Sequence, residues 1–205
     1  MMQPAITKDP ADIILECAIQ RFSIYGFNKT TMAEIADDAS MSAANIYRYF
    51  KNKQDIAAVC TRNIMNERLA VLTKAIRNPE LTAGQRLEQY VLETLQFSRT
   101  KANENSKIDE ICNEITRHRP DLVHHKIENE KALIMEILTL GNQTGEFQVD
   151  NVMKRAEAIH AMLVVFDVPM FMHLFSEEQY LQIARSSVQI ILAGLGSGSL
   201  SVKTE

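Results

Sequence analysis

The chain has 205 residues, 46% of them apolar and 23% charged, which is the composition of an ordinary globular protein rather than a disordered or fibrous one. Its formal net charge is −4, and residues 1–55 hold six Lys or Arg against seven Asp or Glu, so bulk charge gives no indication of nucleic-acid binding. Three scattered cysteines without a CxxC pair favour a reducing compartment. The first ten residues lack the apolar core of a signal peptide, and we therefore expect a cytoplasmic protein.

The first predicted helix begins after Asp9-Pro10, since Asp is a good N-cap and Pro is favoured at the first helical position. Its apolar residues Ile14, Ala18 and Phe22 share one face, and Gly26 is expected to end it.

Two short helices follow, over residues 32–38 and 43–49. Thr31 and Glu34 have the spacing of a capping box, and Ser42 is the expected N-cap of the second helix. The predicted contacts between the two helices are Ile35, Ala36, Ala39 and Ile46. Two short capped helices joined by a tight turn form a helix-turn-helix, whose second helix enters the major groove of DNA.

The rest of the chain also has helical periodicity and no sustained alternation of period two. The predicted helices run from Asn52 or Asp55 to residue 76, from Thr82 to Lys101, from about Ser106 to Arg119, from Pro120 to Gly141, from an Asp150 cap over 151–175, and over 177–195 after Ser176. With a loop over 141–150, the expected fold is all-α with about nine helices. Its expected parts are a three-helix head over 9–51, a ligand-binding and dimerisation domain over 52–195, and a disordered tail over 196–205.

The last two predicted helices are apolar almost all round, and such helices must be covered on every side. A partner copy is the simplest cover, so we expect a homodimer with Val188 and Ile191 in its seam. Residues 159–175 are too short and too polar at Asp167 and Pro169 to span a bilayer, so no membrane association is expected.

The second helix of the helix-turn-helix has side chains suited to reading DNA. Its first turn, Ser42 to Asn45, is small and polar; Asn pairs well with adenine, and Ala can contact a thymine methyl. Its far end is aromatic and basic, with groups that reach phosphates: Tyr47, Arg48, Tyr49, Lys51 and Lys53. The alternative is that the aromatic residues are core; we expect this of Phe50 and not of both tyrosines.

The run from Ile14 to Ile56 resembles the N-terminal domain of TetR-family regulators. The matching residues are Ala18, Phe22, Gly26, Thr30-Thr31, Ile35-Ala36, Ser42, Ile46-Tyr47, Tyr49-Phe50, Lys53 and Ile56. The resemblance implies a nine-helix dimeric repressor with a C-terminal ligand pocket. By position it implies phosphate contacts at Thr31, Tyr47, Tyr49 and Lys53, and a base-facing set of Ala43, Ala44, Asn45 and Arg48.

A mainly lipophilic effector is expected, because the C-terminal region lacks Trp, has few acids on its helical stripes, and is rich in adaptable Met. The candidate lining residues are Phe97, Cys112, Ile115, Met135, Leu138, Met162, Phe166 and Met170. Pro169 should kink its helix, and Asp167 needs a partner, either in the dimer seam or on the effector. Cys112 is read as a buried thiol, with redox sensing as the alternative.

Catalytic and metal-binding signatures are missing from the sequence. HExxH, GxSxG and P-loop motifs do not occur, and the rings of His124 and His125 diverge by about 100° on a helix. We therefore expect no enzyme, cofactor or metal. The sequence predicts a ligand-responsive repressor that binds a palindromic DNA operator as a dimer and is released by a lipophilic small molecule. The alternative is a TetR-like DNA binder that is architectural or controlled by a protein partner.

Overall fold

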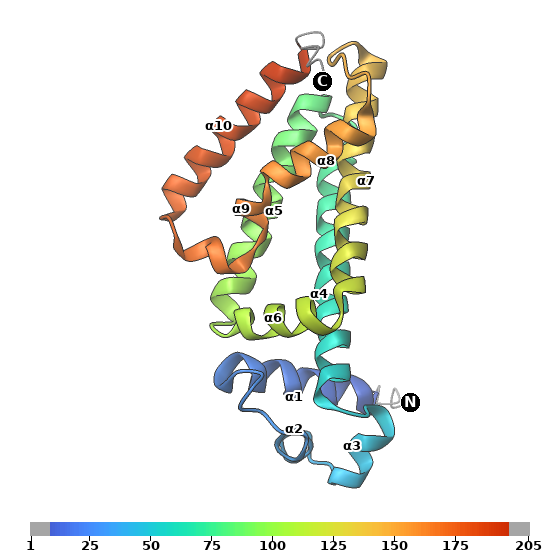
Figure 1. Cartoon of the computed structure of the whole chain (residues 1–205), viewed down its shortest axis with the longest axis vertical. Helices are drawn as coiled ribbons and strands as arrows, with labels where there is room; N and C mark the ends of the chain where they lie inside the picture. The colour runs from blue at the N-terminus through green and yellow to red at the C-terminus, as the bar shows by residue number, and fades with distance from the viewer. Residues whose placement is uncertain (1–8, 197–205) are drawn as a thin grey trace, which may run out of the picture. The chain divides into compact units, whose positions relative to one another are not determined.

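The computed structural model describes residues 9–196, and this part of the chain is all-α, as the sequence predicts (Figure 1). It contains ten α-helices, one 3₁₀ helix and no strand within those residues. The helices are α1 (Pro10–Tyr25), α2 (Met32–Asp38), α3 (Ala43–Tyr49), α4 (Lys53–Ile76), α5 (Ala83–Glu104), α6 (Ile108–His118), α7 (Pro120–Thr144), α8 (Val152–Met162), α9 (Val164–Asp167), the 3₁₀ helix η1 (Pro169–His173) and α10 (Glu177–Gly196).

The chain forms two compact units. Unit 1 comprises residues up to Ile64 together with Asn103–Val123, and unit 2 comprises Met65–Ala102 and the residues from His124 onward. Helix α6, which the sequence assigned to the ligand domain, therefore packs with the helix-turn-helix in unit 1. The chain passes between the units three times, and each passage lies inside a helix, in α4, α5 and α7. The predicted tail beyond Gly196 lies outside the described residues.

Several predicted helix ends are confirmed by their hydrogen bonds. The Asp9 side chain accepts from the Ala11 amide at 2.8 Å, and Gly26 ends α1 with a φ of +89° that favours glycine. At the start of α10, the Ser176 amide donates to the Gln179 side chain, and the Gln179 amide donates back to Ser176 Oγ.

The predicted eighth helix over 151–175 is wrong, because the chain there breaks into α8, α9 and η1. Val168 is extended, with ψ of 119°, and Pro169 opens the 3₁₀ helix. Proline disfavours the helical conformation in the residue before it, so Pro169 ends the helix rather than kinking it. The N-cap of α8 is Asn151, whose side chain accepts from the Lys154 amide at 3.0 Å, and not Asp150.

Gly141 was expected to end a helix, but α7 continues through it to Thr144. A Cβ at this position would collide with the ring of Phe147, which is 4% exposed. The glycine is therefore explained by the packing of Phe147 against the helix and not by a helix stop.

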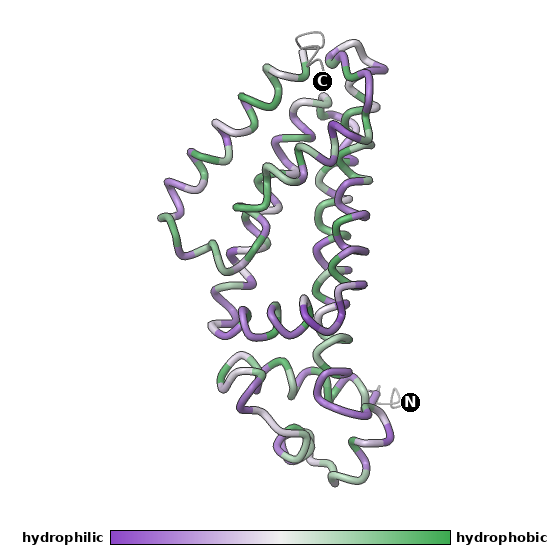
Figure 2. Tube along the Cα trace, in the orientation of Figure 1, coloured by the Kyte–Doolittle hydropathy of each residue, from purple (hydrophilic) through white to green (hydrophobic). Residues whose placement is uncertain are grey.

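The core of unit 2 draws apolar side chains from α4, α5, α7, α8, α9, η1 and α10. Figure 2 shows hydrophobic residues recurring along α10, whereas α6 is mostly hydrophilic. Val188 and Ile191, expected in a dimer seam, are instead buried within the protomer. They share a helix face with Ala184 and Leu195, because these positions lie three or four residues apart. No described helix is long and apolar enough to cross a membrane.

Candidate DNA interface and a buried ionic cluster

Helices α2 and α3 are fixed locally by short side chains. Thr31 Oγ1 accepts from the Glu34 amide at 3.3 Å while Glu34 Oε2 accepts from the Thr31 amide at 2.8 Å, which completes the predicted capping box. Ser42 Oγ accepts from the Asn45 amide at 3.2 Å and caps α3. The turn between the helices is tight, since Ser40 has a φ of +55° and the Met41 amide donates to the Ala36 carbonyl at 2.8 Å.

The contacts predicted to hold this pair together are all buried: Ile35, Ala36, Ala39 and Ile46. Small side chains at Ala36 and Ala39 allow the turn to close on itself. The outer face of α3 is thereby held in one orientation by the caps, the turn and the buried inner face, and its exposed side chains are not needed for this.

That outer face carries the predicted DNA-reading residues. Tyr47 and Tyr49 are 55% and 40% exposed, whereas Phe50 is 8% exposed, so both tyrosines face outward and only Phe50 is core, as expected. The other exposed residues of the predicted set are Thr31, Ser42, Ala43, Ala44 and Arg48, and Asn45 is half-buried. A face with a small first turn and an aromatic and basic far end suits a major groove flanked by phosphates.

Lys53 has a more buried environment than the other predicted phosphate ligands. Its Nζ donates to the Phe27 carbonyl at 2.6 Å and lies 4.3 Å from the centre of the Phe27 ring. Burial lowers the pKa of Lys53, although Glu114 and Glu110 of α6 oppose that change. An ammonium has three donors, so two remain for a phosphate, and that role stays a prediction.

The end of α1 and the turn after it are fastened by residues that the sequence did not single out. The Asn28 amide donates to Glu110 Oε2 at 2.9 Å, and Ser23 Oγ donates to the Glu104 carbonyl at 2.8 Å. Glu110 also lies directly against Gly26, where a Cβ would come within 2.5 Å of its carboxylate. These contacts join residues more than eighty positions apart, so no local pattern could have revealed them.

A small exposed ionic group lies on the head between α1 and α2. Arg21 makes a two-pronged contact with Asp38, with Nε and Nη2 at 2.6 and 2.9 Å from its oxygens, and Nη1 lies 3.1 Å from Glu34. The hydrogen bond to Asp38 raises the pKa of Arg21 and lowers that of Asp38.

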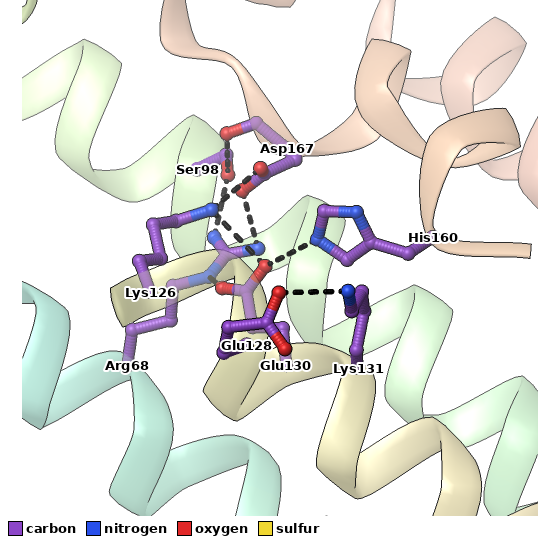
Figure 3. A network of polar contacts seen from close by, with 8 residues as sticks. All are labelled: Arg68, Ser98, Lys126, Glu128, Glu130, Lys131, His160 and Asp167. Carbon is purple, nitrogen blue, oxygen red and sulfur yellow. Dashed lines mark hydrogen bonds and ion pairs between the residues drawn. The ribbon is translucent and has the colours of Figure 1, made fainter. Parts of the chain in front are cut away.

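Unit 2 contains a second ionic group, here called the buried cluster and made of Arg68, Ser98, Lys126, Glu130, His160 and Asp167 (Figure 3). Arg68 Nε lies 2.6 Å from Glu130 Oε1, and its Nη2 lies 2.6 Å from Asp167 Oδ1. Lys126 Nζ bridges the same two acids, at 3.0 Å from Glu130 and 2.6 Å from Asp167. His160 Nε2 lies 3.2 Å from Glu130 Oε2.

The charged groups of the buried cluster compensate one another. The side chains of Arg68 and Glu130 are 5% and 4% exposed. Burial alone would raise the pKa of Glu130, but the His160 hydrogen bond and the charges of Arg68 and Lys126 outweigh it and bring the pKa to about 2. Two cations and two carboxylates are thus held together in an apolar domain. The sequence foresaw that Asp167 needs a partner, but its partners are Arg68 and Lys126 of the same chain rather than a seam or an effector.

A metal ion fits the buried cluster poorly. Glu130, His160 and Asp167 bring one ligand atom each within 4.8 Å of one another. Both oxygens of each acid, however, already contact Arg68 or Lys126, and a divalent ion would have to enter beside these two cations. Nothing in this donor set therefore supports a metal site.

The predicted effector-lining residues divide between the units. Cys112 and Ile115 belong to α6 in unit 1, and Phe97, Met135, Leu138, Met162, Phe166 and Met170 belong to unit 2. Leu138 and Phe166 are buried, whereas Met162 and Met170 are 58% and 57% exposed. Phe97 and Phe166 lie at the buried cluster, since Arg68 is 5.7 Å from the Phe97 ring centre and Phe166 directly precedes Asp167.

Two family profiles match the chain, and between them they span most of it. Residues 14–60 match "Bacterial regulatory proteins, tetR family", and residues 83–185 match "Tetracyclin repressor-like, C-terminal domain". The chain belongs to the TetR family. Its helix-turn-helix is accordingly a DNA-binding domain of a transcriptional regulator, as the sequence predicts.

Named TetR-family relatives are distant from this chain. RutR of Escherichia coli K12 is 30% identical over 123 residues, which are 60% of this chain and 56% of RutR. YvkB of Bacillus subtilis is 23% identical over 73% of this chain and 77% of YvkB. The chain therefore matches little more than half the length of RutR.

Solved structures of bacterial regulators share the fold. A regulator from Rhodococcus RHA1 has a TM-score of 0.68 at 22% identity, covering 94% of this chain and all of that one. The fatty acid degradation regulator FadR of Bacillus halodurans has a TM-score of 0.66 at 17% identity, covering 92% of this chain and 97% of FadR.

Proposed function

We propose that this TetR-family protein is a cytoplasmic, ligand-responsive repressor that binds a palindromic operator as a homodimer and is released by a lipophilic small molecule. The observation that carries the proposal is the outer face of α3, whose candidate reading residues project from a doubly capped, tightly turned helix pair. A surface of that kind suits base reading, because its direction is fixed before DNA arrives.

Within this surface, Arg48 and Asn45 are proposed to read bases, and Lys53 with the two tyrosines is proposed to contact phosphates. Footprinting on the DNA upstream of the protein's own gene tests the proposal. Replacement Arg48→Ala should cost about 1–3 kcal/mol of binding free energy and relax preference at one position of each half-site. Arg62, an exposed residue of α4, supplies a matched control, since Arg62→Ala removes the same charge away from α3.

A homodimer is proposed through the outward faces of α8 and α10. Met153 on α8 and Ile190 on α10 are 60% and 68% exposed, and large apolar side chains left exposed in this way are typical of an interface. Ile190→Asp should yield monomers without operator binding. Gln189→Asp, which places the same charge on the neighbouring exposed position, is the matched control. Sedimentation velocity measures the result, and a wild-type monomer at micromolar concentration would contradict the dimer.

A lipophilic effector is proposed to bind among the apolar residues of unit 2, with Phe97, Phe166, Met162 and Met170 as lining groups. Thioethers repack readily around ligands of differing shape. A thermal-shift screen of lipophilic metabolites, followed by operator release with the hits, tests this step. Operator binding that no small molecule relieves would favour the protein-partner-controlled or architectural alternative.

A further inference from the structure

The two acids of the buried cluster contact the same two cations, but they belong to helices of very different length. Glu130 lies inside α7, a helix of 25 residues, and its side chain is 4% exposed. Asp167 is the last residue of α9, a helix of four residues, and is followed by the extended Val168. The Asp167 side chain is also more exposed, at 14%. Of the two carboxylates, only that of Asp167 stands on a segment that can withdraw without unwinding a long helix.

Asp167 itself is held in unit 2 by polar contacts, whereas its neighbour Phe166 packs in the apolar core. The Asp167 carboxylate contacts Arg68 and Lys126, and the Asp167 carbonyl accepts from Ser98 Oγ at 2.8 Å. The partners come from α4, α5 and α7, so one residue of the break is held by three long helices (Figure 3).

Apolar side chains surround this polar anchor. The Phe97 ring faces the Arg68 guanidinium, and Phe166 is 1% exposed beside Asp167. Met162, the last residue of α8, and Met170 in η1 lie on either side of α9 in the sequence, and both are exposed. A molecule that bound here would meet the charges of Arg68 and Lys126 beside the aromatic rings of Phe97 and Phe166.

We infer that Asp167 occupies the place of a ligand carboxylate, and that the effector is an amphipathic carboxylic acid whose head group displaces Asp167 from Arg68 and Lys126. The inference deepens the proposed function and rests on its effector step. It replaces a generally lipophilic effector with one chemical class, an apolar chain or ring that ends in a carboxylate.

The charge balance of the buried cluster selects this class. A carboxylate that takes the place of Asp167 leaves two cations facing two anions, so the electrostatics of the apolar interior are unchanged. A neutral head group would leave two buried cations with one carboxylate, and a metal ion or ammonium would add a third cation. Guanidinium groups also bind carboxylates in a two-pronged geometry that a neutral alcohol cannot reproduce.

Displacement of Asp167 has a consequence for regulation. The released residues 164–173 join α8 to α10, the two helices proposed to form the dimer, so head-group binding and dimer geometry would be linked through this break. By linkage, an acid that loosens operator binding must itself bind less tightly to the operator complex.

Calorimetry of the intact protein with decanoate, 3-phenylpropanoate and decan-1-ol tests the inference, on the wild type and on Asp167→Asn. The asparagine keeps the shape but removes the internal competitor, so both acids should bind about tenfold more tightly to the variant, while decan-1-ol should not gain. Glu177→Gln is the matched control, because it removes a carboxylate from an ion pair with Arg99 elsewhere in unit 2 and should leave the affinity for the acids unchanged.

The opposite outcomes overturn the inference. A purely structural Asp167 predicts that Asp167→Asn weakens or abolishes acid binding, and a general apolar pocket predicts equal binding of decan-1-ol and decanoate to the wild type. Failure of both acids to bind either protein also overturns it, as does a zinc or nickel complex that is lost in His160→Gln. If Asp167→Asn does not fold, the wild-type preference for decanoate over decan-1-ol and methyl decanoate decides. Operator binding is measured separately. Release of the operator by neutral compounds alone would contradict the carboxylate inference but not the proposed repressor function.

Discussion

The head and unit 2 each contain an arginine that contacts two acids, and the two groups differ in nearly every physical respect. Arg21 on the head pairs with Asp38 and Glu34, whose side chains are 39% and 43% exposed. Arg68 in unit 2 pairs with Glu130 and Asp167, whose side chains are 4% and 14% exposed. The acids of the first group are exposed to water, which screens their charges; the second group lies in an apolar core, where each charge depends on its partners.

The difference teaches how each region is held. The head owes its shape to caps and a close turn, so its surface charges remain available for a polyanion such as DNA. The buried cluster of unit 2 joins five helices, α4, α5, α7, α8 and α9, so that a change at one residue alters the arrangement of several segments. Arginine–carboxylate pairs therefore lie on the surface of the head, whereas in unit 2 they connect helices within the core.

Removing the buried arginine should have the largest effect. Arg68→Met leaves Glu130 and Asp167 without their main counter-charge, and breaking a buried pair of this kind costs about 3–5 kcal/mol of unfolding free energy. Chemical denaturation measures the loss, with Arg77→Met as control, because Arg77, which directly follows α4, makes an exposed ion pair with Glu136 of α7. Equal losses of unfolding free energy in the two variants would show that the buried and exposed ion pairs contribute equally to stability.

The pH response of Glu130 should come next. Its pKa in the folded protein is about 2, below the usual value of 4.5, so its contribution to stability is fully present above pH 4.5 and is lost as the pH falls towards 2. Carbon-13 NMR of the glutamate carboxyl groups should show Glu130 still ionised at pH 3. A titration midpoint of Glu130 near its ordinary value would mean that the cations do not hold it.

Loss of a helix cap on the head should have a moderate effect. Thr31→Ala removes the hydroxyl that accepts from the Glu34 amide and caps the start of α2. The expected loss of unfolding free energy is about 1 kcal/mol. Thermal denaturation monitors the change, and Thr31→Ser, which keeps the hydroxyl, should recover most of it. Alanine and serine variants of equal stability would show that the capping box contributes little.

The smallest effect is expected at Arg21 of the head, whose acidic partners are exposed. Arg21→Gln should change the unfolding free energy by less than about 1 kcal/mol, because water and salt screen its partners. Raising the salt concentration should shrink even that difference, whereas the Arg68→Met effect should persist. A loss at Arg21 comparable with that at Arg68 would show that the head depends on its ionic group.

The parts of the molecule that short-range chemistry determines could be predicted from the sequence. The capping box at Thr31, the N-cap at Ser42 and the outward tyrosines all follow from residues within one or two helical turns. Pairings between distant residues could not be foreseen: Asp167 with Arg68, or Glu110 with the Asn28 amide, since nothing local records them. Pro169 was noticed, but whether it bends or ends a helix depends on the conformation of Val168.

The most direct test of the proposed function is selection of bound sequences from a random double-stranded DNA library by the wild type and by Arg48→Ala. The wild type should enrich an inverted repeat whose half-sites lie about one helical turn, or a multiple of it, apart, and Arg48→Ala should enrich the same repeat with one relaxed position in each half-site. No enriched inverted repeat, or a repeat whose preferences Arg48→Ala leaves untouched, would contradict the reading of DNA by the outer face of α3.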